Sequence, residues 1–269
     1  MLIGNMMRIF NWKSICVIHG HEILMGGKLK KLLIKKALSN FDSLIAVSSY
    51  SKRVTLEKCP NLKIEVINNG LETNRFTLTE NIKKRLTNEL RLITVGSMSY
   101  RKGQHNVIRS IPYLKNHYDN ITYHIIGKSI IEGELRDLTK SLGVQSNVKF
   151  HGYVSDEKIS KVMDESDIFI MLSENLKNGE VEGFGIAILE ANYLGLPAIG
   201  SKNCGIEDAI KEGITGRLVD INDNRTLLDA TIDILSNYNS YSKDALNWSK
   251  KNDWSIIIKK YMDHMNKLC

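Results

Sequence analysis

Short apolar runs alternate with amphipathic segments along almost the whole chain, and this alternation constrains the fold more than any other feature. Runs typical of buried strands lie at residues 14–19, 42–48, 63–67, 90–96, 121–127, 147–152, 167–173, 197–200 and 216–220. Segments with helical spacing lie at about residues 25–39, 50–58, 104–116, 132–142, 156–165, 186–194, 206–211, 224–237 and 254–267. A strand followed by a helix, repeated many times, predicts an α/β fold with parallel sheets.

The repeated units are interrupted by a polar and weakly periodic stretch, residues 71–88. We expect this stretch to link two domains, because 269 residues are enough for two modest hydrophobic cores. The predicted domains cover residues 1–76 and 77–247. The last segment, residues 248–269, is predicted to form an amphipathic helix.

Charge and composition restrict the functions that the chain can have. A net charge of +7 favours an anionic partner. Nucleic acid is the least favoured of these partners, since aromatic residues make up only 7% of the chain and we find no nucleic-acid-binding motif. The four cysteines form no C-x-x-C pair, and no apolar run is long enough to span a membrane. With no signal-peptide pattern at residues 1–10, we expect a cytoplasmic protein.

A lysine-rich helix is predicted over residues 25–39, with Lys28, Lys30, Lys31, Lys35 and Lys36 surrounding an apolar stripe. The region from Lys28 to Lys36 could rest on an anionic membrane, which would place the protein peripherally on the inner face. The alternative is an ordinary surface helix with a solvated, lysine-rich face.

The stretch Gly179 to Glu190 lies between a predicted strand and a predicted helix and reads G-E-V-E-G-F-G-I-A-I-L-E. Its glycines allow the backbone to approach a ligand, and the helix start attracts an anion. Seven residues separate Glu182 from Glu190, and in a helix this eight-position step would place both carboxylates on roughly one side. The pattern therefore favours a polar ligand that carries phosphate. The alternative is a strand, loop and helix with a solvated Glu182.

Other candidate residues also follow predicted strands, where ligands bind in open α/β sheets. They are His19, the loop from Ser97 to Lys102, and Val154. Lys102, with Arg101 beside it, could neutralise a diphosphate, unless both are solvated loop cations. Glu190 could accept hydrogen bonds from two vicinal hydroxyls of a ribose, unless it is a buried acid satisfied by backbone groups.

Several familiar chemistries lack their motifs. The chain contains no P-loop, no G-x-G-x-x-G after a strand and no G-x-S-x-G. His19 and His21 have no convincing third ligand nearby in the sequence, so we predict no metal site. No D-x-D occurs either, which counts against a divalent metal that holds a diphosphate.

The E-G-F-G-x-x-x-x-E pattern from Glu182 to Glu190 resembles the signature of the retaining glycosyltransferases of family 4, the glycosyl transferases group 1, which have the GT-B fold. The resemblance spreads over nearly the whole chain and includes Val17 to Gly20, Ala46 to Lys52, Val66 to Phe76, Val95 to Gly103, Phe150 to Val154 and Gly213 to Val219. It implies two Rossmann-like domains with parallel sheets, the first on the acceptor side. The second would bind a nucleotide-sugar, and the terminal helix would cross back to the first domain.

The resemblance also implies a role for each matching residue. Glu182 would contact the donor sugar near its anomeric carbon, and His19 would reach the same sugar from the first domain. Lys102 would contact the diphosphate, Val154 the base and Glu190 the ribose. The backbone from Gly183 through Phe184 and Gly185 to Ile186 would meet phosphate or sugar. No cofactor is implied beyond the donor itself, a UDP-sugar or GDP-sugar, and the acceptor would be a glycan or a lipid-linked glycan of the cell envelope.

Two departures from the family pattern qualify this interpretation. Ser97 stands where the family usually has arginine, so either Arg101 would supply the missing charge from the same loop or phosphate binding would be weaker. Only three predicted strands precede the linker, so the first domain is expected to be incomplete and the chain shortened at its N-terminus. The alternative hypothesis is therefore a non-catalytic nucleotide-sugar-binding module that needs a partner, and an epimerase or phosphorylase is a third. The sequence does not define the sugar, base, acceptor, linkage or oligomeric state.

Overall fold

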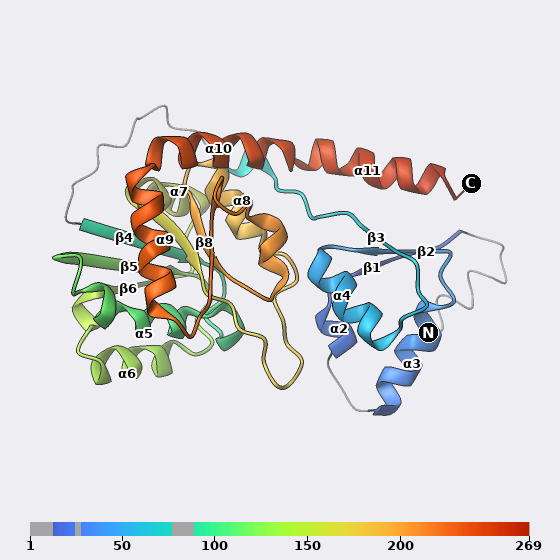
Figure 1. Ribbon diagram of the computed structural model, residues 1–269, viewed down its shortest axis with the longest axis horizontal. Helices are drawn as coiled ribbons and strands as arrows, with labels where there is room; N and C mark the ends of the chain where they lie inside the picture. The colour runs from blue at the N-terminus through green and yellow to red at the C-terminus, as the bar shows by residue number, and fades with distance from the viewer. Residues whose placement is uncertain (1–12, 25–27, 77–88, 269) are drawn as a thin grey trace.

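The computed structural model describes residues 13–24, 28–76 and 89–268, and in these residues the named strands form two separate sheets. The first sheet has three strands in the order β1-β2-β3, which span Ile15–Ile18, Ser43–Ala46 and Ile64–Val66. The second has six strands in the order β6-β5-β4-β7-β8-β9 (Figure 1). Neighbouring strands in both sheets run parallel, as the alternation of strands and helices predicts.

The strands of the second sheet are β4 (Glu89–Val95), β5 (Asn120–Ile126), β6 (Val148–Gly152), β7 (Ile168–Met171), β8 (Ala198–Ser201) and β9 (Gly216–Val219). The chain builds outward from β4 to β6, returns to place β7 on the other side of β4, and then builds outward again. The order of the strands therefore reverses between β4 and β7. In open parallel sheets, ligands bind at the carboxyl ends of the strands beside such a reversal.

Helices cover both faces of the second sheet. Alternate residues of its strands point to opposite faces, so Leu92 and Ile170 belong to one apolar cluster while Ile93 and Phe169 belong to the other. The first cluster includes side chains of α5 (Gln104–Leu114), α6 (Glu132–Ser141) and α9 (Asn224–Ser236). The second includes side chains of α7 (Asp156–Glu165) and α8 (Ile186–Tyr193).

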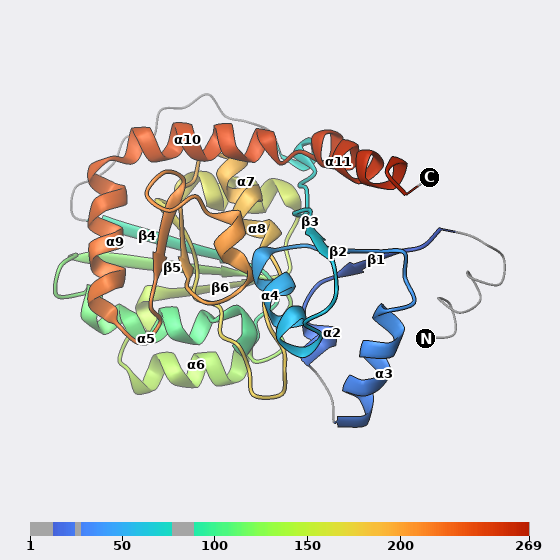
Figure 2. The same ribbon diagram turned by 45° about the vertical axis from the view of Figure 1, so that its right-hand side comes forward.

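The first sheet is covered in the same way, but one of its covers comes from the far end of the chain. Leu44 and Ala46 pack toward α2 (His21–Leu24) and α3 (Lys28–Leu38). Ile45, on the opposite face, packs against Ile257 of α11 (Trp254–Asn266). Figures 1 and 2 show α11 running back over the first sheet, on the side away from α3 and α4 (Ser49–Lys58).

Two helix predictions need correction. The helix α10 (Tyr238–Lys251) was not predicted, because its many Asn, Ser and Lys residues resemble a loop. It is helical because Tyr241, Ala245 and Ser249, spaced four residues apart, form a buried face. The last segment, residues 248–269, is not one helix, since α10 ends at Lys251 and α11 begins at Trp254, with Asp253 as its N-cap. The helix predicted at about residues 254–267 is confirmed by α11.

The other predicted strands and helices are confirmed with small shifts at their ends, and the predicted segment 206–211 is a 3₁₀ turn, η4 (Gly205–Ala209). Ser48 and Ser155 cap α4 and α7 by accepting hydrogen bonds from backbone N–H groups. Residues 25–27 of the lysine-rich helix and residues 77–88 of the linker lie outside the described residues. None of the helices in the described ranges is long and apolar enough to cross a bilayer.

Candidate functional site

A cleft of about 650 Å³ lies where the two domains meet at the carboxyl ends of β1, β4 and β7. The first domain contributes His19, His21 and Asn69 to its lining. The second contributes Arg101, Lys102 and the continuous stretch Glu180 to Ala187. The cleft thus combines the loops after β4 and β7, the two strands between which the strand order reverses.

The loop after β4 is shaped by Gln104, a fully buried residue whose role no sequence motif indicates. Its amide nitrogen donates to the carbonyl of Ser97 over 3.1 Å, and its amide oxygen accepts from the N–H of Ser99 over 3.3 Å. Ser97 itself does not line the cleft, so the predicted contact of this residue with the ligand stays a prediction.

Gly103 lets this loop lie against the end of β7. Its φ of +75° is in the left-handed region, and a Cβ there would be 1.7 Å from the carbonyl oxygen of Leu172. The close approach places the turn η2 (Tyr100–Lys102) beside the loop that carries Glu182. Arg101 and Lys102 therefore both line the cleft, and Arg101 comes from the same loop as Ser97. Their contact with a diphosphate stays a prediction.

Glu182 is the centre of the charges in the cleft. Only 8% of it is exposed, and one of its oxygens, Oε2, pairs both with Arg101 and with the Lys102 ammonium, the latter at 2.8 Å. Burial alone would raise the pKa of Glu182, but the two cations outweigh it and hold the pKa below its ordinary value. The carboxylate is therefore ionised at neutral pH, and two cations that could bind phosphate are held beside it.

The stretch after Glu182 presents backbone to the cleft. Phe184 is buried in the core, so only its main chain is available to a ligand. Gly185 has φ of +85° and is the N-cap of α8, whose first turn at Ile186 and Ala187 lines the cleft. A helix start of this kind favours an anion. Because α8 begins only at Ile186, the expected helical relation between Glu182 and Glu190 is wrong, and each carboxylate has its own cationic partners.

His19 approaches the cleft from the end of β1, where its carbonyl accepts a hydrogen bond of 2.9 Å from Ser51 Oγ. The same carbonyl lies against Gly183 of the second domain, where a Cβ would be only 2.6 Å away. The two domains also meet at Asp208, whose carboxylate accepts hydrogen bonds from the N–H of Ser49, at 2.7 Å, and from Asn68. Glycine at position 183 therefore keeps His19 close to Glu182 and its loop.

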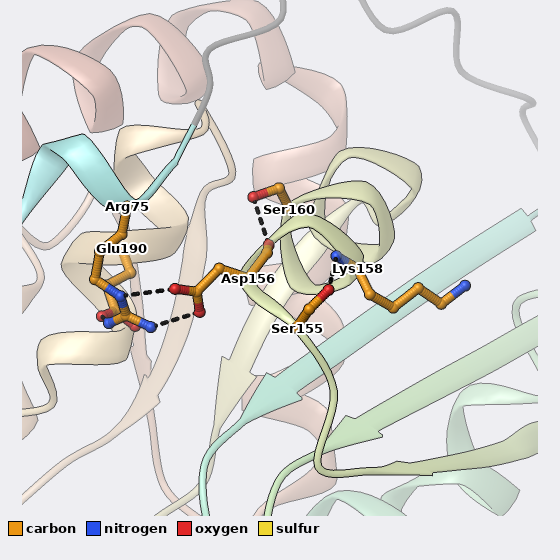
Figure 3. Close-up of polar contacts among 6 residues, drawn as sticks. All are labelled: Arg75, Ser155, Asp156, Lys158, Ser160 and Glu190. Carbon is orange, nitrogen blue, oxygen red and sulfur yellow. Dashed lines mark hydrogen bonds and ion pairs between the residues drawn. The ribbon is translucent and has the colours of Figure 1, made fainter.

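A second polar cluster, separate from the lining of the cleft, contains Glu190. Its Oε1 accepts a hydrogen bond of 2.6 Å from Arg75, which also forms a two-pronged ion pair with Asp156 (Figure 3). Val154, two residues before Asp156, is half-buried against the core of the second domain. Burial, together with the charge of Asp156, raises the pKa of Glu190, while Arg75 and Lys102 act in the opposite direction.

The structure thus divides the predicted site residues into two groups. His19, Arg101, Lys102, Glu182 and the backbone from Gly183 to Ile186 line one cleft, whereas Glu190, Val154 and Ser97 lie beyond its lining. Lys102 acts on the pKa of both Glu182 and Glu190, so the two groups are electrostatic neighbours. His21, Asn69, Arg75 and Asp156 were not predicted. Asn69 could have been noticed, because it belongs to the Asn-Asn-Gly turn after the third strand.

Among the described residues, no three or more His, Cys, Asp or Glu side chains cluster so that they could hold a metal ion. The predicted absence of a metal in the reaction stays a prediction. Predicted membrane contact through Lys28 to Lys36 also stays a prediction, because the side chains of residues 28–32 lie outside the described part of the chain.

Comparison with known proteins identifies relatives at the level of family and fold. The chain is 27% identical over 224 residues to the amylovoran biosynthesis glycosyltransferase AmsK of Erwinia amylovora. This alignment covers 82% of this chain and 54% of AmsK. It is 26% identical over 226 residues to a GDP-mannose-dependent alpha-(1-6)-phosphatidylinositol monomannoside mannosyltransferase of Mycobacterium tuberculosis, covering 81% of this chain and 59% of that enzyme. The chain therefore spans somewhat more than half the length of these relatives.

A solved structure, Anabaena Alr3699/HepE in complex with UDP and glucose, matches with a TM-score of 0.78 at 18% identity. The match covers 98% of this chain and 74% of that one, so the GT-B type fold is shared by both domains. The family model described as glycosyl transferases group 1 matches residues 77–252, which include the loops after β4 and β7 and the whole of α8. The chain belongs to the glycosyl transferases group 1.

Proposed function

We propose that this protein is a retaining glycosyltransferase that takes a sugar from a UDP-sugar or GDP-sugar and attaches it to a glycan or lipid-linked acceptor. We further propose that it acts in the synthesis of a surface polysaccharide or glycolipid, with residues 1–76 on the acceptor side and residues 77–247 on the donor side. The amylovoran and phosphatidylinositol mannoside enzymes described above support this class of acceptor, since both are named for such products.

One observation carries the proposal. A cationic pair, a buried carboxylate and the first turn of a helix line the same cleft, and a histidine from the other domain faces them. Arg101 and Lys102 together with the start of α8 suit a diphosphate. Glu182 and His19 line the same cleft, and we propose that both contact a sugar attached to that diphosphate. A site for inorganic phosphate alone would not need an acid among its cations.

The chemistry follows from this arrangement. The bond between the anomeric carbon and the diphosphate oxygen breaks, and the oxygen of an acceptor hydroxyl forms a new bond to that carbon. The hydroxyl proton passes to the departing diphosphate, so that the products are the glycosylated acceptor and the nucleoside diphosphate. Negative charge grows on the departing diphosphate, where Arg101, Lys102 and the N–H groups of α8 would stabilise it. These groups could do so without a metal ion, which is the basis for proposing a metal-independent reaction. Glu182 would bind the donor sugar beside the anomeric carbon, and His19 would close over it from the first domain.

Calorimetric titration with UDP and GDP tests donor binding. We expect one of them to bind and Lys102→Ala to weaken it by at least about tenfold, because a charge-assisted contact with phosphate is lost. Lys140→Ala is the matched control, since Lys140 lies on the exposed face of α6. Failure of both nucleotides to bind the folded wild-type chain would disprove the proposal.

Turnover distinguishes an enzyme from the alternative, a binding module without activity. The alternative is not favoured, because both relatives described above are named as sugar-transferring enzymes. Incubation with a donor, a lipid-linked acceptor and EDTA should yield product whose new linkage has the donor's anomeric configuration by NMR. Product with the opposite configuration would refute retention, and activity that EDTA abolishes and magnesium restores would refute metal independence.

A further inference from the structure

Arg75 joins two carboxylates of the second domain from an element outside its sheet. It belongs to the turn η1 (Thr73–Arg75), at the end of the connection that leaves the first domain. Its Nη1 contacts Glu190 Oε1 at 2.6 Å, and its Nη2 contacts Asp156 Oδ1 at 2.8 Å. Figure 3 shows the guanidinium between the start of α7, which carries Asp156, and the helix α8, which carries Glu190.

The connection is anchored without Arg75. Backbone hydrogen bonds join Leu71 to Asn252 and to Trp254, and Thr73 Oγ1 donates to Asp253 over 2.7 Å. Phe76 is only 5% exposed. Arg75, by contrast, has a side chain that is 37% exposed, and ion pairs of such exposure add little to stability. The contacts of Arg75 with Glu190 and Asp156 are therefore not needed to attach the connection to the second domain, and they require another explanation.

The geometry at Glu190 supplies that explanation. Arg75 occupies Oε1, while Oε2 accepts no hydrogen bond from any residue in the described part of the chain. We propose that Arg75 is a positioning residue that fixes the Glu190 carboxylate so that Oε2 is presented to the ribose hydroxyls of the nucleotide. Asp156 holds the other edge of the same guanidinium and so keeps it in place. This inference rests on the proposed function, because it assigns a ligand class to that same donor site.

Electrostatics supports the arrangement. The charged groups that face Glu190 are Arg75 from η1, Asp156 from α7 and Lys102 from η2. Burial raises the pKa of Glu190, and Asp156 raises it further, whereas Arg75 and Lys102 lower it. Loss of Arg75 would therefore both free the carboxylate to rotate and increase its tendency to take up a proton. A protonated Glu190 accepts hydrogen bonds from ribose less well.

The test compares UDP or GDP, whichever binds the wild-type chain, with its 2′,3′-dideoxy analogue. We expect the wild type to prefer the ribonucleotide by about tenfold or more, as hydrogen bonds to a charged acceptor allow. Arg75→Gln should bind the ribonucleotide more weakly than the wild type does, while its affinity for the analogue should stay within about twofold of the wild-type value. Most of the preference for the ribonucleotide should therefore be lost. Asp156→Asn should also reduce the preference for the ribonucleotide, but by less. Arg75→Lys should keep more of that preference than Arg75→Gln does. Because burial raises the pKa of Glu190 and Arg75 opposes that shift, ribonucleotide binding by Arg75→Gln should strengthen with rising pH over a higher pH range than binding by the wild type does.

Arg136→Gln is the matched control. Arg75 lies over the ring of Phe76, and Arg136 likewise lies over the ring of Phe150. Arg136 pairs with the carboxylate of Glu132, but it is on α6. Its substitution should leave the preference for ribose unchanged. Equal weakening of both nucleotides in Arg75→Gln, or an unchanged preference in a variant whose circular dichroism matches the wild type, would overturn the inference. Equal binding of the ribonucleotide and the analogue by the wild type would also overturn the inference about Arg75, but it would leave the proposed function standing. If the wild type bound neither, the proposed function itself would be refuted.

Discussion

Replacement of Glu182 by glutamine is the most informative change at the cleft, because it removes a charge without changing the size of the side chain. In the structure Arg101 and Lys102 both pair with Glu182 Oε2. If these cations also bind the donor's diphosphate, the diphosphate must share them with Glu182. Glu182→Gln should therefore bind free UDP or GDP more tightly, even though it removes a conspicuous polar residue from the site.

The size of the effect follows from the contact at 2.8 Å between Lys102 and Glu182. Two unit charges at this distance attract by about 6 kcal/mol at an effective dielectric constant of about 20. Most of this attraction is offset by the desolvation of a carboxylate that is only 8% exposed. A residual difference of about 1.4 kcal/mol corresponds to about tenfold tighter binding of the nucleotide. Sugar transfer should fall by about a hundredfold, since Glu182 is also the proposed contact of the reacting sugar.

Calorimetry with UDP or GDP and with the matching nucleotide-sugar measures both parts of this prediction. The nucleotide-sugar should gain less affinity than the free nucleotide, because its sugar loses a partner. Glu212→Gln is the control, since Glu212 pairs with Arg217 at 3.1 Å outside the lining of the cleft. Unchanged or weaker binding of the free nucleotide by Glu182→Gln would refute the idea that Glu182 and the diphosphate share the same cations.

The same variant changes the acid stability of the chain. The pKa of Glu182 is lower in the folded chain than its ordinary value near 4.5, so its charge favours folding above that value. This contribution is lost as the pH falls through the folded pKa. Urea unfolding of the wild type should therefore show a loss of stability below about pH 4.5, and the loss should be smaller in Glu182→Gln.

Two further predictions concern the contact between domains and a buried histidine pair. Gly183→Ala would place a Cβ 2.6 Å from the His19 carbonyl, so it should lower transfer at least about tenfold while nucleotide affinity stays within about twofold. Gly133→Ala, which has open space, is its control, and a normal rate in Gly183→Ala would count against a role for this contact. Burial, with the neighbouring charge of His151, lowers the pKa of His124 to about 4. Because folding then favours the neutral ring, the free energy of unfolding should fall by about 2 kcal/mol as the pH falls from about 6.5 to about 4. Urea unfolding over this pH range should show a smaller fall in His124→Gln.

The fold was predictable because strands and helices each leave a periodic pattern. Leu44 and Ala46 alternate with Ile45, and the structure places them on opposite faces of the first sheet. The helix α10 escaped prediction because its buried positions are tyrosine, alanine and serine instead of large aliphatic residues. Its stability comes from packing against α8, a contact that no local pattern reveals.

The site was predictable where function depends on segments that are continuous in sequence. Glu182 and the backbone from Gly183 to Ile186 line the cleft as expected. The interaction of Arg75 with Glu190 was not predictable, since 115 positions separate the two residues and nothing in either segment indicates the other. Arg101 illustrates an intermediate case, because its neighbour Lys102 suggested a phosphate site but not that both cations would pair with Glu182.

Both carboxylates of the proposed donor site are paired with arginine or lysine, and this common feature has a consequence for binding. At Glu182 a ligand's phosphates would compete with the carboxylate for Arg101 and Lys102, whereas at Glu190 a ribose would add to a carboxylate that Arg75 already holds. Removing the Glu182 carboxylate and removing the Arg75 guanidinium should therefore have opposite effects on nucleotide affinity. Loss of the Glu182 charge strengthens the binding of nucleotide, and loss of the Arg75 charge weakens it.

The double variant, Glu182→Gln with Arg75→Gln, tests whether the two clusters act independently. If they do, its change in the free energy of nucleotide binding should be nearly the sum of the changes in the two single variants. Lys102 affects the pKa of both carboxylates, so we expect a departure from additivity, and strict additivity would show that this shared cation does not couple phosphate binding to ribose binding.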